Sequence, residues 1–405
     1  MSIAFVDGRV VVGNGKVLER ASVLVEGERI LKVATKNYTP PKGCRRISLK
    51  GRTLLPGFID AHVHLCLDGS PDPVTAFMNT PLPISLLKAA NFARDTLMAG
   101  VTTIRDMGAK DGIDLGLRQA IRTGLVPGPR MLVSGQLICM TGGHGWPLGR
   151  EANGADEVRK AAREQIKAGV DIVKLMATGG VMTPAVEPGS EQFTEAELAA
   201  GVEEAHKAGK KTATHAMGTN GILNALRAGI DSIEHGVYLD DEAVELMKKR
   251  GVPLIPTLSA LLQIESKGLK AGIPAFAVEK TAKVKPFHLA SIRLARQAGV
   301  AVAMGTDAGT PFNLHGENLR ELKLLAEHSG FSPGEAIEAG TRVSAQVLGL
   351  EKELGTIEAG KLADLVAVDG NPLDDIDILL RRPSIRLVVQ GGRIVNPNPM
   401  KGEIG

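Results

Sequence analysis

The segment FIDAHVHL, residues 58–65, is a short apolar run that ends in two histidines, His62 and His64. In an extended strand, side chains two positions apart point to the same side, so this segment delivers two imidazoles to one place. Two neighbouring imidazoles are typical of a divalent metal site. The triplet alone is weak evidence, because either histidine could equally be a buried structural residue.

Seven further apolar runs follow, and a helical pattern separates each from the next. They are VTTIRDMG, RMLVSG, VDIVKLMA, KTATH, DSIEH, VPLIPT and VAMGTD. Thr194 with Glu197, and Ser332 with Glu335, have the spacing of capping boxes at helix starts. Strands that alternate with helices pair in parallel, and eight such units favour a closed (β/α)8 barrel over an open sheet.

Polar residues end several of these predicted strands. In a (β/α)8 barrel the C-terminal ends of the strands meet at one rim, where chemistry takes place. Taken singly, a histidine could be a satisfied barrel residue and the aspartate a helix N-cap. As a set in register they favour a metal site. The set comprises His62 and His64 on the first strand, Lys174 on the fourth, His215 on the fifth, His235 on the sixth and Asp307 on the eighth.

Both ends of the chain have the pattern of short strands and turns. Residues 1–56 contain AFVDGRVVV and ASVLVEGERILKVA, and residues 355–405 contain ADLVAVDG and IRLVVQGGRIVN, with a hairpin turn expected at Gly391 and Gly392. Unpaired strand edges are costly, so the two ends are expected to form one discontinuous β domain beside a barrel of residues 57–354. Two separate sheets remain an alternative.

Composition narrows the possible partners. The formal charge of +3 comes from 48 basic and 45 acidic side chains, without the basic runs typical of nucleic-acid binding. No segment approaches the roughly 20 apolar residues that a membrane span needs. Three scattered cysteines, Cys44, Cys66 and Cys139, fit a reducing cytoplasm. We therefore expect a cytoplasmic protein with a small-molecule substrate.

Several motifs resemble those of the amidohydrolase superfamily of metal hydrolases. These are PGFIDAHVHL, DIVKLMATGG, THA, IEHG, GTDAG and LGTIEAGKLADLVAVDGNP, which span essentially the whole chain. TGGHG at residues 141–145, together with KLMATGGV, resembles the branch of Xaa-Pro dipeptidases, arginine and lysine carboxypeptidases and imidazolonepropionase. The resemblance implies an α/β fold, a distorted (β/α)8 TIM barrel with a small β-sandwich domain from both termini. It also implies a homo-oligomer, for which an octamer is one candidate form.

The resemblance further implies a binuclear centre with two divalent ions, zinc being the first expectation. His62, His64 and Asp307 would hold one ion, and His215 with His235 the other. Lys174 would bridge both ions as a carbamate, because a protonated lysine cannot ligate a cation. An ordinary ion pair is the alternative for this lysine. Manganese, cobalt and iron also suit these ligands.

The expected mechanism follows from this centre. Two ions lower the pKa of a shared water, and the resulting hydroxide attacks a carbonyl carbon. Asp307 would accept the proton and pass it to the departing nitrogen. Deaminase relatives carry a glutamate where this chain has Gly218, so hydrolysis of dipeptides or N-acyl amino acids is favoured. Imidazolonepropionase-like, ester, lactone or xenobiotic amide hydrolysis, and a non-enzymatic metal-binding relative, are the alternatives.

Substrate residues are predicted mainly from the branch resemblance. His144 in TGGHG and Tyr238 in EHGVYLD are candidates for catalysis and for gripping a substrate carboxylate, with solvation and packing as the respective alternatives. Arg105 could anchor an anion or form a salt bridge, and Arg150 is a weaker candidate. Residues 179–197 are expected to form a lid or a structural loop. The remaining histidines His206, His288 and His328 are predicted to lie at the surface. His315, which follows Asp307 in PFNLHGEN, is the exception to this prediction.

Overall fold

The computed structural model describes residues 2–35 and 38–396, and the chain divides into two compact units. The first unit, called here the sheet unit, comprises the described residues within 1–60, 94–103 and 316–405. The second, called the barrel unit, comprises residues 61–93 and 104–315. Residues 1, 36–37 and 397–405, which belong to the predicted β domain, lie outside the described part of the chain.

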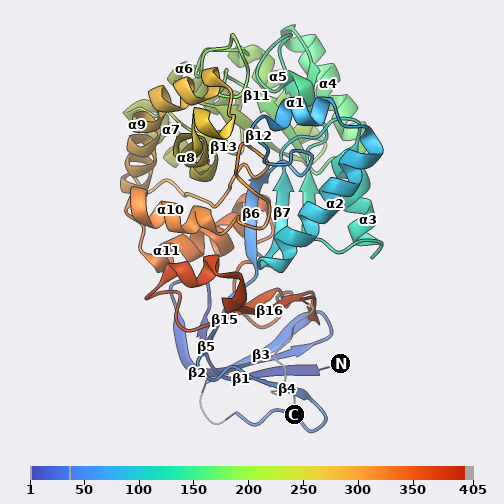
Figure 1. Ribbon diagram of the computed structural model, residues 1–405, viewed down its shortest axis with the longest axis vertical. Helices are drawn as coiled ribbons and strands as arrows, with labels where there is room; N and C mark the ends of the chain where they lie inside the picture. The colour runs from blue at the N-terminus through green and yellow to red at the C-terminus, as the bar shows by residue number, and fades with distance from the viewer. Residues whose placement is uncertain (1, 36–37, 397–405) are drawn as a thin grey trace. The chain divides into compact units, whose positions relative to one another are not determined.

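One sheet of eight strands contains segments from both ends of the chain (Figure 1). Its order is β17-β16-β15-β5-β1-β2-β3, with β4 also paired to β1. The antiparallel pairing of β15 with β5 joins the two ends, so the sheet is continuous. The strands are β1 (Ser2–Val11), β2 (Val17–Glu26), β3 (Arg29–Thr35), β4 (Arg45–Ser48), β5 (Arg52–Pro56), β15 (Leu365–Asp369), β16 (Ile385–Gln390) and β17 (Arg393–Ile394).

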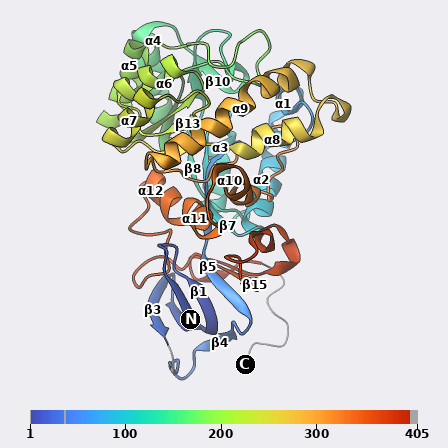
Figure 2. The ribbon, with the colours of Figure 1, turned by 90° about the vertical axis from the view of Figure 1, so that its left-hand side faces the viewer.

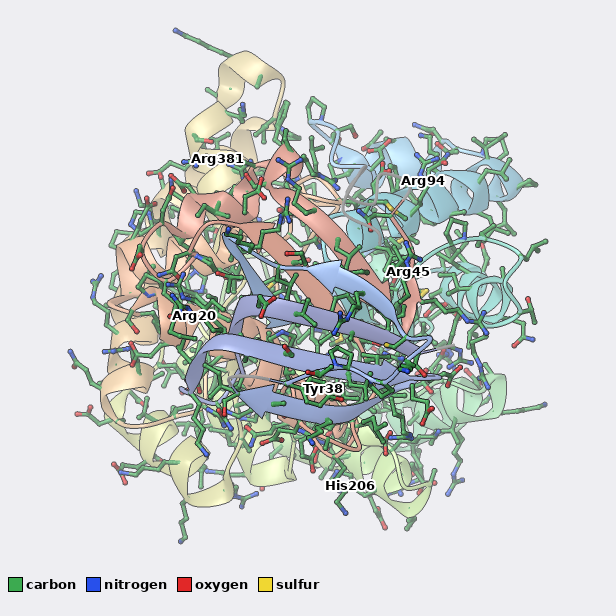
Figure 3. The ribbon with its side chains drawn as sticks, turned by 90° about the horizontal axis from the view of Figure 1, so that it is seen from below. Arg20, Tyr38, Arg45, Arg94, His206 and Arg381 are labelled. Atoms are coloured by element: carbon green, nitrogen blue, oxygen red, sulfur yellow. The ribbon has the colours of Figure 1, made fainter. Side chains whose placement is uncertain are left out.

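The sheet packs around its own aliphatic core. Phe5, Val23, Leu54 and Leu365 come from four different strands and are fully buried in one cluster. Figure 3 shows these strands from below, with Arg20 of β2 at the left and Arg45 of β4 at the right of the view. β5 and β15 are buried along almost their whole length, and β2 is buried over its second half, which agrees with the short apolar runs from which the strands were predicted.

The sheet unit also contains helices, which moves its boundary away from the predicted one at residue 355. Ser332 and Glu335 form the predicted capping box. Residues 316–354 cluster with the sheet rather than with the barrel. Their helices are α10 (Arg320–Ser329), α11 (Pro333–Glu338) and α12 (Ser344–Leu348), and a π turn, Ala339–Val343, joins the last two.

The strands of the barrel occur in two sheets. The first has the order β6-β7-β8, and the second, β10-β9-β11-β12-β13-β14, is parallel throughout. Seven of the predicted strands are present, while β9 and β10 were not predicted. The strands are β6 (Phe58–Val63), β7 (Val101–Asp106), β8 (Arg130–Val133), β9 (Leu137–Cys139), β10 (Gly149–Glu151), β11 (Ile172–Met176), β12 (Lys211–Ala216), β13 (Ile233–His235) and β14 (Leu254–Ile255).

The eighth predicted segment does not form a continuous strand, but it bridges its two expected neighbours. Val302 pairs with Leu254 of β14, and Ala308 pairs with Val63 of β6, both in parallel. Short irregular pairing of this kind is how a distorted barrel keeps its strand order. The prediction of a distorted (β/α)8 barrel with helices between parallel strands is therefore confirmed.

Helices lie around the strands of the barrel unit in Figures 1 and 2. Thr194 and Glu197 form the predicted capping box at the start of α5, and Gly169 ends α4 with a φ of +91°. No described helix is both long and apolar enough to cross a membrane. The helices are α1 (Pro73–Met78), α2 (Leu82–Met98), α3 (Ile113–Arg122), α4 (Gly154–Ala168), α5 (Glu195–Lys207), α6 (Thr219–Ala228), α7 (Asp241–Arg250), α8 (Leu258–Lys267) and α9 (Ala275–Gln297).

Candidate metal centre

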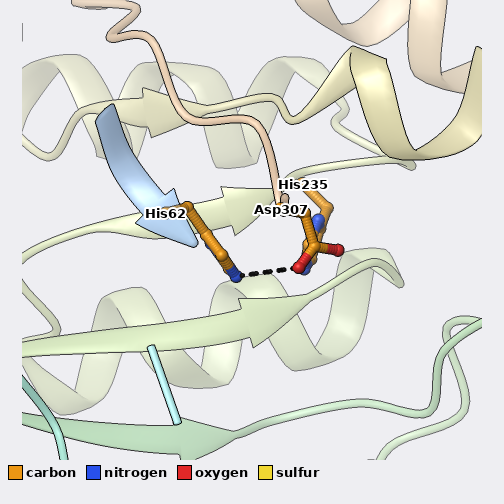
Figure 4. A group of neighbouring side chains, drawn as sticks. All are labelled: His62, His235 and Asp307. Atoms are coloured by element: carbon orange, nitrogen blue, oxygen red, sulfur yellow. Dashed lines mark ion pairs between the residues drawn. The ribbon is translucent and has the colours of Figure 1, made fainter. Parts of the chain in front are cut away.

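Side chains from the ends of the barrel strands converge on one buried place. The ring of His62 lies 5.4 Å from that of His64 and 5.2 Å from that of His235, and the rings of His215 and His235 are 4.5 Å apart. Asp307 Oδ1 lies 3.5 Å from His62 Nε2 and 3.4 Å from His64 Nε2. Figure 4 shows His62, His235 and Asp307, whose ligand atoms lie within 4.8 Å of one another.

Two of these residues have a strained backbone. His235 has a φ of +69° and Asp307 a φ of +58°, in the left-handed region that favours glycine. Such conformations cost on the order of 1–3 kcal/mol each and persist where the surrounding structure enforces them. Both residues lie at the rim with their side chains toward the centre, and backbone strain at such a place is typical of a functional site.

Each histidine of the set has one ring nitrogen held by a partner outside the set, and the Nε2 atoms of His62 and His64 lie beside Asp307. Such outer partners fix the orientation of metal-binding histidines. The contacts are His62 Nδ1 to Glu234 Oε2 at 2.7 Å, His64 Nδ1 to Gly108 O at 2.9 Å, His215 Nε2 to Gly179 O at 3.2 Å and His235 Nδ1 to Thr257 Oγ1 at 2.7 Å.

Burial sets the charge of these groups. It lowers the pKa of His64 to about 4 and holds the pKa values of the other three histidines well below their ordinary value. The imidazoles are therefore neutral at neutral pH, the form that binds metal ions. Burial raises the pKa of Asp307 to about 7, and the charge of Lys174 opposes this shift.

Lys174 on β11 is 2% exposed and lines the same cavity as the histidines and Asp307. Its Nζ has no hydrogen-bond partner among the described residues, and burial lowers its pKa to about 8. An isolated buried amine of this kind is costly unless another group binds it. Four neutral imidazoles, a carboxylate and an unpartnered lysine together fit a divalent metal centre.

A cavity of about 360 Å³ lies over this centre. His144 lines it, with its ring centroid 4.3 Å from that of His215. Thr183 Oγ1 lies 2.8 Å from His144 Nδ1. The backbone N–H of His144 donates to Gln192 Oε1 at 2.9 Å. Burial lowers the pKa of His144 to about 3, so its ring is neutral at neutral pH.

Residues 53–395 match the sequence profile of the Amidohydrolase family. The chain belongs to this family. The ochratoxinase of Aspergillus niger is 30% identical over 417 residues, covering 96% of this chain and 85% of that relative. A crystal structure of a Xaa-Pro dipeptidase with bound methionine in the active site has a TM-score of 0.91 and 33% identity, covering 98% and 100% of the two chains.

The predicted branch is also confirmed. The imidazolonepropionase of Thermoplasma acidophilum is 23% identical over 412 residues, covering 94% of this amidohydrolase and 90% of the relative. This amidohydrolase is therefore a hydrolase whose relatives include the dipeptidase and imidazolonepropionase groups predicted from TGGHG and KLMATGGV. Its substrates are small molecules, as expected for the family.

Arg105 does not lie in the cavity of this amidohydrolase, which corrects its predicted role in substrate binding. It is 1% exposed, and its guanidinium donates to Ala61 O at 2.6 Å, Ser232 Oγ at 3.2 Å and Glu234 Oε1 at 2.8 Å. The salt bridge that the sequence left open is thus present. Because Glu234 also holds His62, Arg105 acts beneath the centre rather than on a substrate.

Tyr238 is likewise absent from the described residues that line the cavity. Its ring lies 5.1 Å from that of Phe287, and it packs against a cluster that includes Val237 and Met217. The structure therefore gives Tyr238 the packing position that the sequence left open, and its contact with a substrate stays a prediction.

Of the other residues singled out from the sequence, some line the cavity and some do not. Arg150 pairs with Glu164 at 2.9 Å and does not line the cavity. Residues 181–184 of the expected lid segment form part of the wall. Lys280 of α9 donates to the carbonyl oxygens of Thr183 at 2.7 Å and Val186 at 2.5 Å. The segment is thus tied to a helix as a structural loop would be.

The histidines predicted to lie at the surface behave differently from one another. His206 is exposed and pairs with Asp231. Figure 3 shows His206 at the lower edge of the view. His288 was predicted wrongly: it is 1% exposed and lines the cavity, because it lies on the buried face of α9. His315 is buried, donates from Nε2 to Leu67 O at 2.9 Å and lies outside the lining. His328 is half-buried.

Three residues around the centre were missed by the sequence reasoning: Glu234, Thr257 and His288. Glu234 directly precedes His235 in IEH, but a strand places neighbours on opposite faces, so adjacency did not indicate contact with His62. Thr257 follows the predicted strand VPLIPT at its C-terminal end. A polar residue at that end of a barrel strand could have indicated a place near the centre.

Proposed function

We propose that this amidohydrolase is a binuclear metal-dependent hydrolase that cleaves the amide bond of dipeptides or N-acyl amino acids. The observation that carries the proposal is the buried convergence of four oriented neutral imidazoles, one carboxylate and the unpartnered amine of Lys174. A single metal held by histidines alone would leave this buried amine without a role.

The donor set divides between two ions, zinc being our first choice. His62, His64 and Asp307 would hold one ion, His215 and His235 would hold the other, and a carbamate on Lys174 would join both. When bound, such ions activate a water and polarise the carbonyl oxygen of a substrate.

The chain's own residues supply the remaining steps. An oxygen of Asp307 takes a proton from the attacking water and returns it to the departing nitrogen, which leaves as an amine. His144 is neutral and held at Nδ1 by Thr183, so its Nε2 orients a polar group of the substrate. The buried walls of the cavity limit the access of other water molecules.

Gly218 favours hydrolysis over deamination. A Cβ at this position would lie 2.0 Å from Gly189 O, so no side chain fits without moving the backbone. The glutamate typical of deaminase relatives at this position therefore has no room. Amide hydrolysis is the chemistry that the remaining residues support.

The test is release of free amino acid from a panel of Xaa-Pro, Xaa-Arg, Xaa-Lys and N-acyl amino acids by protein purified with zinc and bicarbonate. We expect release that falls at least a hundredfold after dialysis against a chelator and returns when zinc is added. Release that the chelator leaves unchanged would contradict the metal dependence. Silence across the panel with two ions bound would instead favour ester or lactone hydrolysis.

A further inference from the structure

Three residues that line the cavity carry buried polar atoms without a hydrogen-bond partner among the described residues. They are Lys174 at Nζ, Thr281 at Oγ1 and His288 at both ring nitrogens. Thr281 and His288 are each 1% exposed. Buried polar groups are nearly always hydrogen-bonded, so an unpartnered one in a cavity wall points to a ligand. Lys174 belongs to the metal centre, which leaves Thr281 and His288 to be explained.

Thr281 and His288, called here the α9 pair, lie on one face of α9. Seven residues are close to two helical turns, which brings both side chains to the same side of the helix. The neighbouring part of the wall is apolar, because Leu261 and Ile264 of α8 line the cavity and belong to one apolar cluster with Val284 of α9. The α9 pair therefore supplies hydrogen-bonding groups to a stretch of wall that otherwise has few.

The ring of His288 can accept a hydrogen bond. The carbonyl oxygens of His235 and Pro256 lie near it, outside hydrogen-bond geometry. No described carboxylate pairs with this ring, and a buried imidazolium without such a partner is unfavourable, so the ring is neutral. A neutral imidazole has one N–H and one acceptor nitrogen. Because carbonyl oxygens only accept, they could serve the N–H alone, and the acceptor nitrogen is open to a donor on a bound molecule.

We propose that the α9 pair is a polar subsite for an uncharged substrate group that carries an O–H or N–H, with His288 as the acceptor. Thr281 binds a second polar atom of the same substrate, two turns along the helix. The inference rests on the proposed amide hydrolysis and adds a contact that selects among its substrates. A methyl ether lacks the hydrogen of the free hydroxyl and would leave the His288 nitrogen unpaired, so the hydroxyl compound is favoured.

The first test compares matched probes with the zinc-loaded protein. They are ortho-, meta- and para-hydroxybenzoyl-alanine with their methoxy counterparts, and benzoyl-tyrosine with benzoyl-O-methyltyrosine, which place the donor on either side of the amide. KM and kcat are measured for a probe that is hydrolysed, and Kd by calorimetry for one that is not. We expect at least one hydroxyl compound to be favoured at least tenfold over its methyl ether, in kcat/KM or in Kd.

The second test repeats the comparison in variants. His288→Phe removes both ring nitrogens and should bring the preference below threefold, whereas His288→Gln keeps an acceptor oxygen and should restore part of it. If His288→Phe does not fold, His288→Leu takes its place. Thr281→Val should weaken the hydroxyl compound and its ether alike, at least threefold. The exposed His206→Phe is the matched control and should keep the full preference. Metal content is measured in every variant and should not change.

Each outcome decides the inference. No preference in the unaltered protein, or a preference that survives His288→Phe, overturns it. Loss of metal in that variant also overturns it, because His288 would then support His235 rather than a substrate. Unchanged binding of every probe by Thr281→Val removes Thr281 from the subsite. Selective binding that His288→Phe abolishes, with hydrolysis of no probe, overturns the proposed function and leaves the subsite standing.

Discussion

Glu234 Oε2 lies 2.7 Å from His62 Nδ1, and both side chains are buried. The other oxygen of the same carboxylate accepts from Arg105 at 2.8 Å. The carboxylate thus holds the imidazole so that its Nε2 faces Asp307. An arginine that the sequence offered for substrate binding is in this way part of the support of the metal centre.

Glu234→Gln tests this support. Glutamine keeps the shape but loses the charge that orients His62, so we expect metal affinity to fall about 10- to 100-fold, as for other outer partners of metal ligands. Competition with a chelator measures the affinity, and the exposed Glu242→Gln is the control. Because Arg105 loses its buried partner, Tm is recorded as well, and affinity is compared below the transition. Unchanged affinity in the folded variant would show that Glu234 is not needed to orient His62.

Lys174→Ala tests the bridging role of the unpartnered amine. Removing it takes away the group that would carry the carbamate, so we expect the metal content to fall and activity to drop at least a hundredfold. A short carboxylic acid added to the medium should restore part of both, since it supplies the missing oxygens. Metal analysis and turnover measure these effects, with the exposed Lys42→Ala as control. Full occupancy and activity in Lys174→Ala would refute the bridge.

Asp307→Asn tests proton transfer. The amide can neither accept nor return the proton, and general acid–base groups contribute about 10²- to 10⁴-fold to rates. We expect kcat to fall by at least a hundredfold while a product amino acid still binds, as measured by calorimetry. Turnover close to that of the unaltered enzyme would exclude Asp307 as the proton carrier.

Lys280→Met tests the attachment of the loop that carries Thr183. Lys280 donates to two loop carbonyls, and Thr183 in turn contacts His144, so losing the ammonium should loosen both. We expect faster amide exchange over residues 181–187 and a kcat/KM about tenfold lower. Lys283→Met is the matched control, because Lys283 is exposed and lies 3.9 Å from Glu187. The same exchange and kinetics in both variants would mean that Lys280 does not hold the loop.

The ion pairs of Glu204 join α5 to α4, and their contribution to stability should depend on pH. Its carboxylate accepts from Arg163 at 2.7 Å and Arg159 at 2.8 Å, and Arg163 above all lowers its pKa to about 2. Its pKa in the unfolded chain is near 4.3. The charge therefore stabilises the fold above about pH 5, and this contribution is lost as the pH falls from about 4.5 through about 2.

The difference in Tm between the unaltered protein and Glu204→Gln should accordingly be largest above pH 5 and shrink as the pH falls. Thermal unfolding at several pH values measures it, and the exposed Glu245→Gln is the control. A Tm difference that stays constant from pH 6 to pH 3 would contradict the shifted pKa.

Local features were predictable because their causes are local. The alternation in HVH places His62 and His64 on one side by the geometry of a single strand. The capping boxes at Thr194 and Ser332 depend on residues three positions apart, and both are present. The strand ends at His215, His235 and Lys174 met at one rim because parallel strands in a barrel share their direction.

The sequence by itself determined the barrel, the joined terminal strands and the gathering of histidines, a lysine and an aspartate at one rim, since these follow from periodicity and strand order. Only the tertiary structure decided which side chains contact one another across different strands and helices. Arg105 pairs with Glu234, Tyr238 packs against Phe287, and His288 lies in the cavity wall. These contacts join residues far apart in the chain, and long flexible side chains are directed by the charges and space that packing provides, which no local pattern records.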